Sequence, residues 1–149
     1  MIPNTYHSLY NKTKEHVAQV RGIQTVGSVN YEDLCRVYHR AAQLTLLDIL
    51  LEEHREKHKT TFNDLRGKQC LHHLLLSKFS WPLSQIQTLS LSDVLLLLHD
   101  DLRTDKVDSA AGKYIDGAIS SYHHFLFSDV KDEEWDPDIL EQLLQSTRW

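Results

Sequence analysis

The sequence has few residues that turn a chain sharply, since only five of its 149 residues are glycine and three are proline. A sheet protein needs many tight turns, and each half-buried strand shows an alternation of apolar and polar residues. This sequence has neither the turns nor a long alternation of that kind. It therefore predicts an all-α fold, organised as a single-domain helical bundle.

Cysteine and long apolar runs are equally scarce. Cys35 and Cys70 stand apart in apolar helical patterns, so we expect two buried thiols rather than a disulfide framework or a nucleophile. The longest unbroken apolar run, residues 94–98, is far shorter than the roughly 20 residues that span a bilayer. The N-terminus lacks the basic and apolar segments of a secretory signal. These features predict a cytoplasmic protein that does not bind membranes.

The sequence also lacks a basic stripe. Its net charge is −5, and the acidic residues gather in the second part, where residues 61–149 contain eight Lys and Arg against fourteen Asp and Glu. Nucleic-acid binding draws most of its affinity from clustered basic residues that contact phosphates. We therefore expect no nucleic-acid partner, and a protein partner, if there is one, with a basic surface.

Apolar residues recur at helical spacing along most of the chain. Helix-start signals occur at Asn30, Thr61, Ser90, either Asp105 or Asp108, and Pro137. Six or seven helices are predicted around a long central helix at about 31–59, and all of residues 1–149 form one domain. The other helices are predicted at 4–21, about 61–78, 94–102 and about 108–126, with a short helical turn near 83–86. A last helix starts at 137, and together with the acidic loop before it spans about 128–149.

The chain contains ten histidines, so metal binding has to be considered. His54 and His58 are four residues apart on one helix face, a spacing that suits a shared metal. The sequence between them is not that of a metalloprotease, because no general base stands where that chemistry needs it. The stretch is highly charged, and we expect it to be an exposed helix end.

His99 and Asp100 directly follow the apolar run 94–98. This arrangement resembles the His-Asp signature of the HD-type metal-dependent phosphohydrolases, which are also all-helical. The resemblance implies a metal held by His99 and Asp100 together with an upstream histidine, His72 or His73, and a downstream aspartate, Asp136 or Asp138. Such a metal would activate water for attack on phosphorus. The alternative is a plain helix C-terminus at which His99 meets the negative end of the helix dipole.

Residues 128–137 form an acidic stretch around one tryptophan. An aromatic residue within a charged rim is common at protein interfaces. This pattern makes the stretch and the C-terminal tryptophan candidate partner-binding residues, although Trp135 could instead pack back on the bundle. The candidates are Asp129, Asp132, Glu133, Glu134, Trp135 and Trp149.

The preferred functional hypothesis is a small non-enzymatic regulatory or adaptor protein that binds another protein. No glycine-rich phosphate loop or nucleophile elbow is present in the sequence, and no cofactor is expected. An HD-type phosphohydrolase site at His99 and Asp100 is the first alternative. A helical bundle that binds a small ligand is the second.

Overall fold

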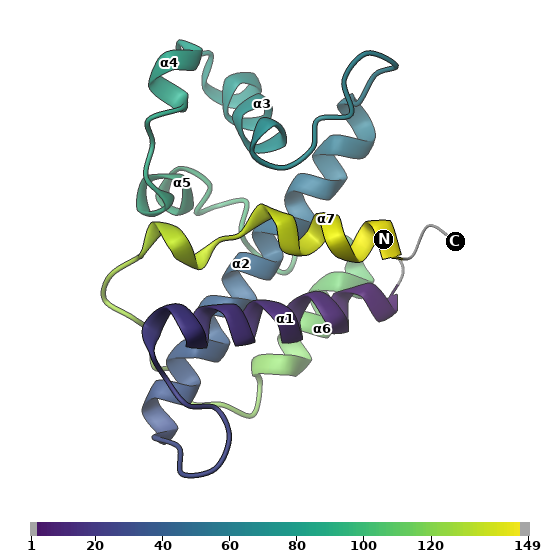
Figure 1. Ribbon diagram of the computed structural model, residues 1–149. Coiled ribbons are helices and arrows are strands. Elements are labelled where there is room, and N and C mark those ends of the chain that lie inside the picture. Colours follow the sequence, from purple (N-terminus) through teal and green to yellow (C-terminus); the bar gives the residue numbers. More distant parts are fainter. Residues whose placement is uncertain (1–2, 147–149) are drawn as a thin grey trace.

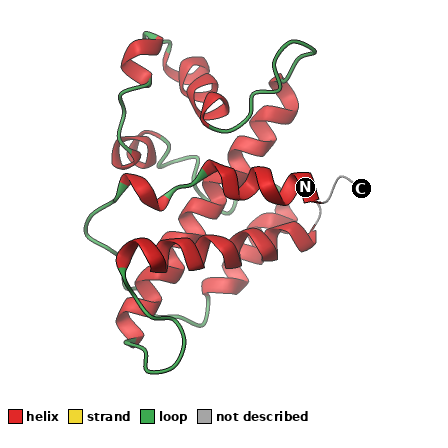
Figure 2. Ribbon diagram, in the orientation of Figure 1, coloured by secondary structure: helices red, strands yellow, loops and turns green. Residues whose placement is uncertain are grey.

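The computed structural model describes residues 3–146, and within that range the chain forms helices and loops without any strand. The predicted all-α class is therefore confirmed, and the helices assemble into one bundle (Figures 1 and 2). The described chain contains seven α-helices and one 3₁₀ turn. Their bounds are α1 Pro3–Arg21, α2 Tyr31–His58, α3 Lys68–Phe79, α4 Leu83–Ile86, α5 Leu91–Leu97, α6 Ser109–Ile119, η1 Asp132–Glu134 and α7 Pro137–Ser146. Across this range, no helix has both the length and the apolar character needed to cross a bilayer.

The longest helix, α2, starts at the cap that the sequence predicts. The side chain of Asn30 accepts a hydrogen bond from the backbone N–H of Asp33, which satisfies one of the free donors at the helix start. Glu32 and Asp33 lie in the first turn, where the helix dipole favours negative charge. The middle of α2 is buried nearly all round, so helices pack on more than one of its faces.

Helices α1, α3 and α6 all pack against α2. Helix α1 also contacts α7, and the two run side by side in opposite directions across the face of α2 (Figure 1). Helix α3 approaches the C-terminal part of α2, where the Cys70 thiol donates to the carbonyl oxygen of Leu51 at 3.1 Å. Leu44 and Leu47 of α2, Leu75 of α3 and Ile115 of α6 are fully buried in this shared core.

Helix α3 begins later than the sequence predicts, at Lys68 rather than near Thr61. Residues 59–67 form a loop because polar side chains bind its backbone. The Thr60 hydroxyl accepts from the N–H groups of Phe62 and Asn63, and the Asn63 side chain accepts from the N–H of Leu65 at 2.8 Å. Such local bonds compete with helix formation.

Helices α5 and α6 are also displaced or shortened relative to the prediction. The Ser90 side chain caps α5 by accepting from the N–H of Asp93, so the helix runs over Leu91–Leu97 instead of 94–102. Helix α6 ends at Ile119 rather than near 126. The aromatic-rich residues 122–127 leave the helix and lie along the N-terminal half of α2, where the rings of Tyr122 and Tyr38 meet at 4.6 Å.

Candidate functional site

Four residues of the predicted metal site lie on two separate segments. His72 and His73 are half-buried on α3, whereas His99 and Asp100 are exposed in the turn that follows α5. Across residues 3–146, no group of three or more His, Cys, Asp or Glu side chains is arranged to hold a metal ion. The structure therefore does not assemble the ligand set that the HD-type resemblance implies.

Three imidazoles do come together, those of His54, His58 and His73. The helix end at 56–58 is exposed as expected, whereas His54 is not. His54 is buried, and its Nε2 lies 2.8 Å from Nδ1 of His73 on α3. The ring of His58 lies over that of His54, with centroids 4.2 Å apart. Burial and the nearby His58, His73 and Lys57 lower the pKa of His54 to about 4. His54 in its neutral form thus joins the end of α2 to α3.

The acidic segment is bound into the molecule, and Trp135 takes the packed position that was one of the two alternatives open from the sequence. Trp135 is 8% exposed and Glu134 is fully buried. The Trp135 indole N–H donates to a carboxylate oxygen of Asp48 on α2 at 2.9 Å. Trp135 is therefore a core residue that packs back on the bundle. Its apolar rings are removed from water and its one polar atom is satisfied.

The remaining carboxylates of the segment lie at the surface. Asp129 pairs with Arg21 at 2.8 Å, and Asp132 accepts from the backbone N–H of Leu91 at the start of α5. The side chain of Glu133 is exposed and has no hydrogen bond or ion pair within the described chain. Trp149 lies outside the described residues. Partner binding by the exposed acidic residues stays a prediction.

Glu134 holds two arginines together below the surface. One of its carboxylate oxygens accepts from Arg21 at 2.7 Å, and both accept from Arg40 at 3.0 and 3.1 Å. The guanidinium groups of Arg21 and Arg40 also lie over the ring of Phe127, at 3.9 and 5.6 Å from its centroid. A buried carboxylate of this kind compensates charges that would be costly to bury alone.

Asp48 is a second buried carboxyl group, and no ion pair links it to a cation within residues 3–146. Burial raises its pKa to about 7, with Asp136 raising it further and the Trp135 hydrogen bond opposing the shift. The carboxyl group therefore gains a proton near neutral pH. It ties the segment before α7 to the middle of α2.

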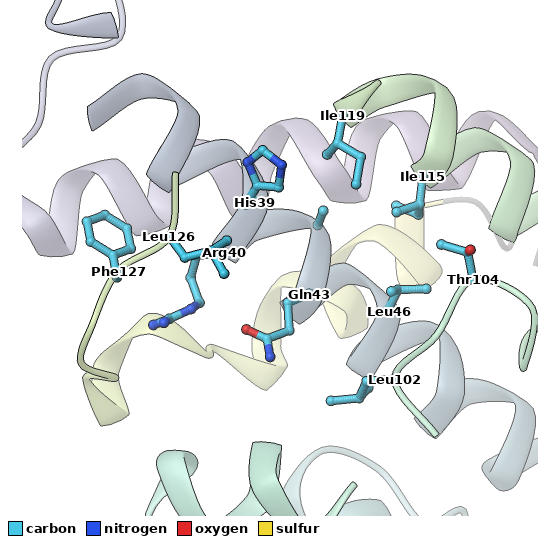
Figure 3. Close-up of a pocket in the computed structure, with 11 residues that line it drawn as sticks. His39, Arg40, Gln43, Leu46, Leu102, Thr104, Ile115, Ile119, Leu126 and Phe127 are labelled. Atoms are coloured by element: carbon cyan, nitrogen blue, oxygen red, sulfur yellow. The ribbon is translucent and has the colours of Figure 1, made fainter. Parts of the chain in front are cut away.

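A cavity of about 450 Å³ opens between α2, α6 and the two segments that flank α6. Its walls are mainly apolar (Figure 3). A volume of this size with mostly apolar walls and a few polar groups is typical of small-molecule sites. The apolar side chains that line it are Ala42, Leu46, Leu102, Ile115, Ile119, Leu126 and Phe127.

Four polar residues line the same cavity: His39, Arg40, Gln43 and Thr104. The first three lie on α2, where Gln43 follows the adjacent His39 and Arg40 by about one helical turn and so shares a face with them. His39 donates from Nδ1 to the carbonyl oxygen of Cys35 at 2.8 Å, and its ring meets the ring of His124 edge-on. The cavity is thus an apolar space with polar groups along one wall.

A second cavity, of about 380 Å³, has a different chemistry. It is lined by carboxylates that already stabilise the fold. Glu53 accepts from the backbone N–H of Asp108, Glu52 pairs with Arg55, and Glu56 pairs with Lys59. Since these groups have structural partners, the apolar cavity is the better candidate for a binding site.

The residues of the apolar cavity were missed by sequence reasoning. They come from parts of the chain up to 88 positions apart, His39 and Phe127 being the extremes. The polar face of the first half of α2 was visible in the sequence, but nothing marked residues 122–127 as the segment that covers it. The two cysteines, by contrast, are buried as expected, and burial raises the pKa of Cys70 to about 12.

Comparison of this chain with protein-family models, with curated proteins and with solved structures found no match.

Proposed function

We propose that this chain is a non-enzymatic binding protein that holds a small, mainly apolar molecule in the cavity between α2 and α6. The observation behind the proposal is the cavity of about 450 Å³ with seven apolar side chains in its wall. Apolar molecules enter such spaces because their transfer from water to an apolar surface is favourable.

The rim of the cavity supports the same function. Leu126 lines the cavity and is 54% exposed, so an apolar side chain stands at its opening. Phe127, beside it, is fixed by the two buried arginines. Phe127 is therefore anchored to the core, whereas Leu126 contacts solvent. A ligand bound in the cavity would cover the apolar surface of Leu126 that water now contacts.

Binding of N-phenyl-1-naphthylamine tests this proposal, because the dye is neutral and its fluorescence rises in apolar surroundings. With about 17 non-hydrogen atoms and roughly 0.3 kcal/mol for each, its Kd should be on the order of 0.1 mM. The variant Ile119→Trp places a large ring in the cavity and should weaken binding by about tenfold or more. Ile119 is half-buried near the end of α6, so the helix should tolerate the change.

The control is Lys113→Trp, an exposed position on the same helix that does not line the cavity. It should bind the dye like the wild type. Circular dichroism checks that both variants are folded. Absence of dye binding by the wild type, or equal binding by Ile119→Trp and Lys113→Trp, would overturn the proposal.

A regulatory or adaptor role through another protein is a second proposal. The exposed carboxylates of Asp129, Asp132 and Glu133 support it, since clustered negative charge favours a basic partner surface. Affinity capture with wild type and Glu133→Lys, followed by mass spectrometry, tests it. A partner lost on that charge reversal is the expected result, and a partner set unchanged by it would contradict the role of this surface.

A further inference from the structure

Among the residues that the structure describes, Arg40 is the only Lys or Arg that lines the apolar cavity, and its charge is already neutralised. Both terminal nitrogens of Arg40 are used, one by the Glu134 carboxylate and the other by the carbonyl oxygen of Asp129 at 3.1 Å. Arg21 shares Glu134 and pairs with Asp129, so two positive and two negative charges balance in this cluster. An anionic ligand would therefore lose its hydration without meeting an unpaired cation.

The neutral polar groups of the cavity, in contrast, are available to a ligand. Neither the Gln43 carboxamide nor the Thr104 hydroxyl has a hydrogen bond within the described chain, and both line the cavity. The Nδ1 of His39 donates to a carbonyl oxygen, so in the neutral imidazole Nε2 is an acceptor. The cavity wall thus offers donors and acceptors without net charge.

Gln43 is the best placed of these groups. Its side chain stands in the middle of the cavity wall, with Arg40 and Phe127 on one side and Leu46, Leu102 and Thr104 on the other (Figure 3). A carboxamide has two N–H donors and an oxygen acceptor, so it pairs best with a group that both donates and accepts. The apolar side chains around it suit the body of the same molecule.

We infer that the ligand of this cavity is a neutral, mainly apolar molecule whose carboxamide-like group pairs with Gln43. The inference rests on the proposed function, since it names the chemical class that the proposed site takes. It goes beyond that function because a cavity of this size and apolarity would by itself accept fatty or aromatic acids as readily as amides.

Displacement of N-phenyl-1-naphthylamine by three matched naphthalenes provides the test. The probes are naphthalene-1-carboxamide, 1-naphthoate and 1-methylnaphthalene, which share one ring system and differ in a single substituent. At about pH 8 the carboxylate is fully ionised. We expect the carboxamide to displace the dye at a concentration about tenfold below that of the carboxylate, and severalfold below that of the methyl compound.

The variant Gln43→Leu should bring the displacement concentrations of the carboxamide and 1-methylnaphthalene together. Both are measured on the same variant, so a change in its own affinity for the dye affects the two probes alike. Gln43→Met serves as a second variant with the same expectation, should the leucine disturb α2. Equal or stronger displacement by the carboxylate, or an amide advantage that survives both variants, would overturn the inference. Dye binding in the wild type that is lost in Ile119→Trp would still support the proposed function in that case, so the two failures are distinguishable.

Discussion

Glu133 and Glu134 are neighbours in the sequence but differ completely in their surroundings. The side chain of Glu133 is exposed, whereas that of Glu134 is fully buried between two arginines. The backbone N–H of Lys131 also donates to Glu134, at 2.7 Å. Removing one member of a buried ionic cluster leaves the others uncompensated, whereas removing an exposed charge affects little.

The pair therefore provides a matched test of the buried cluster. Glu134→Gln keeps the shape of the side chain but removes its charge, and we expect it to lower the free energy of unfolding by roughly 3–5 kcal/mol. Glu133→Gln should change it by less than about 0.5 kcal/mol. Urea denaturation followed by circular dichroism measures both values. Similar urea midpoints for the two variants would show that the cluster contributes little to stability.

The composition of the acidic segment could not reveal this difference. A tryptophan among carboxylates is consistent with an exposed interface and with a segment packed on the bundle. Which of the two structures forms depends on whether arginine or lysine side chains lie close to the carboxylates in the folded protein. Arg21 and Arg40 lie some 90 to 110 positions before their partner in the sequence, and only the packing of α1 against α2 brings them to Glu134.

At the scale of elements, helix α6 is fixed to the preceding loop by a close backbone contact. A Cβ atom added at Gly112, in the first turns of the helix, would overlap the carbonyl oxygen of Thr104. The same atom added at Gly117, further along α6, would meet nothing within 4 Å. Glycine is thus required at the first position, whereas at the second it only costs backbone entropy.

Alanine at these two positions should have opposite effects. Gly112→Ala should destabilise the protein by about 1–3 kcal/mol, because the loop must move to relieve the overlap. Since Thr104 lines the apolar cavity, the same variant should also weaken dye binding. Gly117→Ala should stabilise the protein by roughly 0.5–1 kcal/mol. Thermal unfolding and dye titration together measure these effects, and a stabilised Gly112→Ala variant would refute the close contact.

Where a capping side chain marks it, the start of a helix could be read from the sequence. Asn30, Ser90 and Asp108 all cap the helices expected there, because an N-cap depends on a side chain and a backbone N–H only three residues apart. The end of α6 depends on distant partners instead. Its apolar spacing continues past Ile119, but residues 122–127 gain more by packing their rings along α2, as Phe127 does against Arg40.

At the scale of the whole molecule, two buried titratable groups on α2 link the helices around it. Asp48 joins α2 to the segment before α7 through Trp135, and His54 joins it to α3 through His73. Neither link was visible in the sequence, because both depend on which residues of other helices face α2. The apolar periodicity that predicted the bundle does not specify those neighbours.

The two groups should affect stability in opposite directions as the pH changes. The folded-state pKa of Asp48 is about 7, above its unfolded value of 3.8, so its contribution to stability falls as the pH rises between these values. The folded-state pKa of His54 is about 4, below its unfolded value of 6.5. Its contribution therefore rises over nearly the same interval. Together they should make stability depend less on pH than either group would alone.

Single substitutions should expose each contribution. As the pH increases from about 4.5 to 6.5, the free energy of unfolding of Asp48→Asn should rise relative to wild type, because of the two groups only His54 remains to titrate. That of His54→Gln should fall, with a difference of at most about 1.4 kcal/mol per pH unit in each case.

Urea midpoints measured across this interval give the two differences, in which the other ionisable groups cancel. The double variant should again run parallel to the wild type, since the two groups contact different helices. If plots of unfolding free energy against pH for both single variants stay parallel to that of the wild type, then neither group has the shifted folded-state pKa given above.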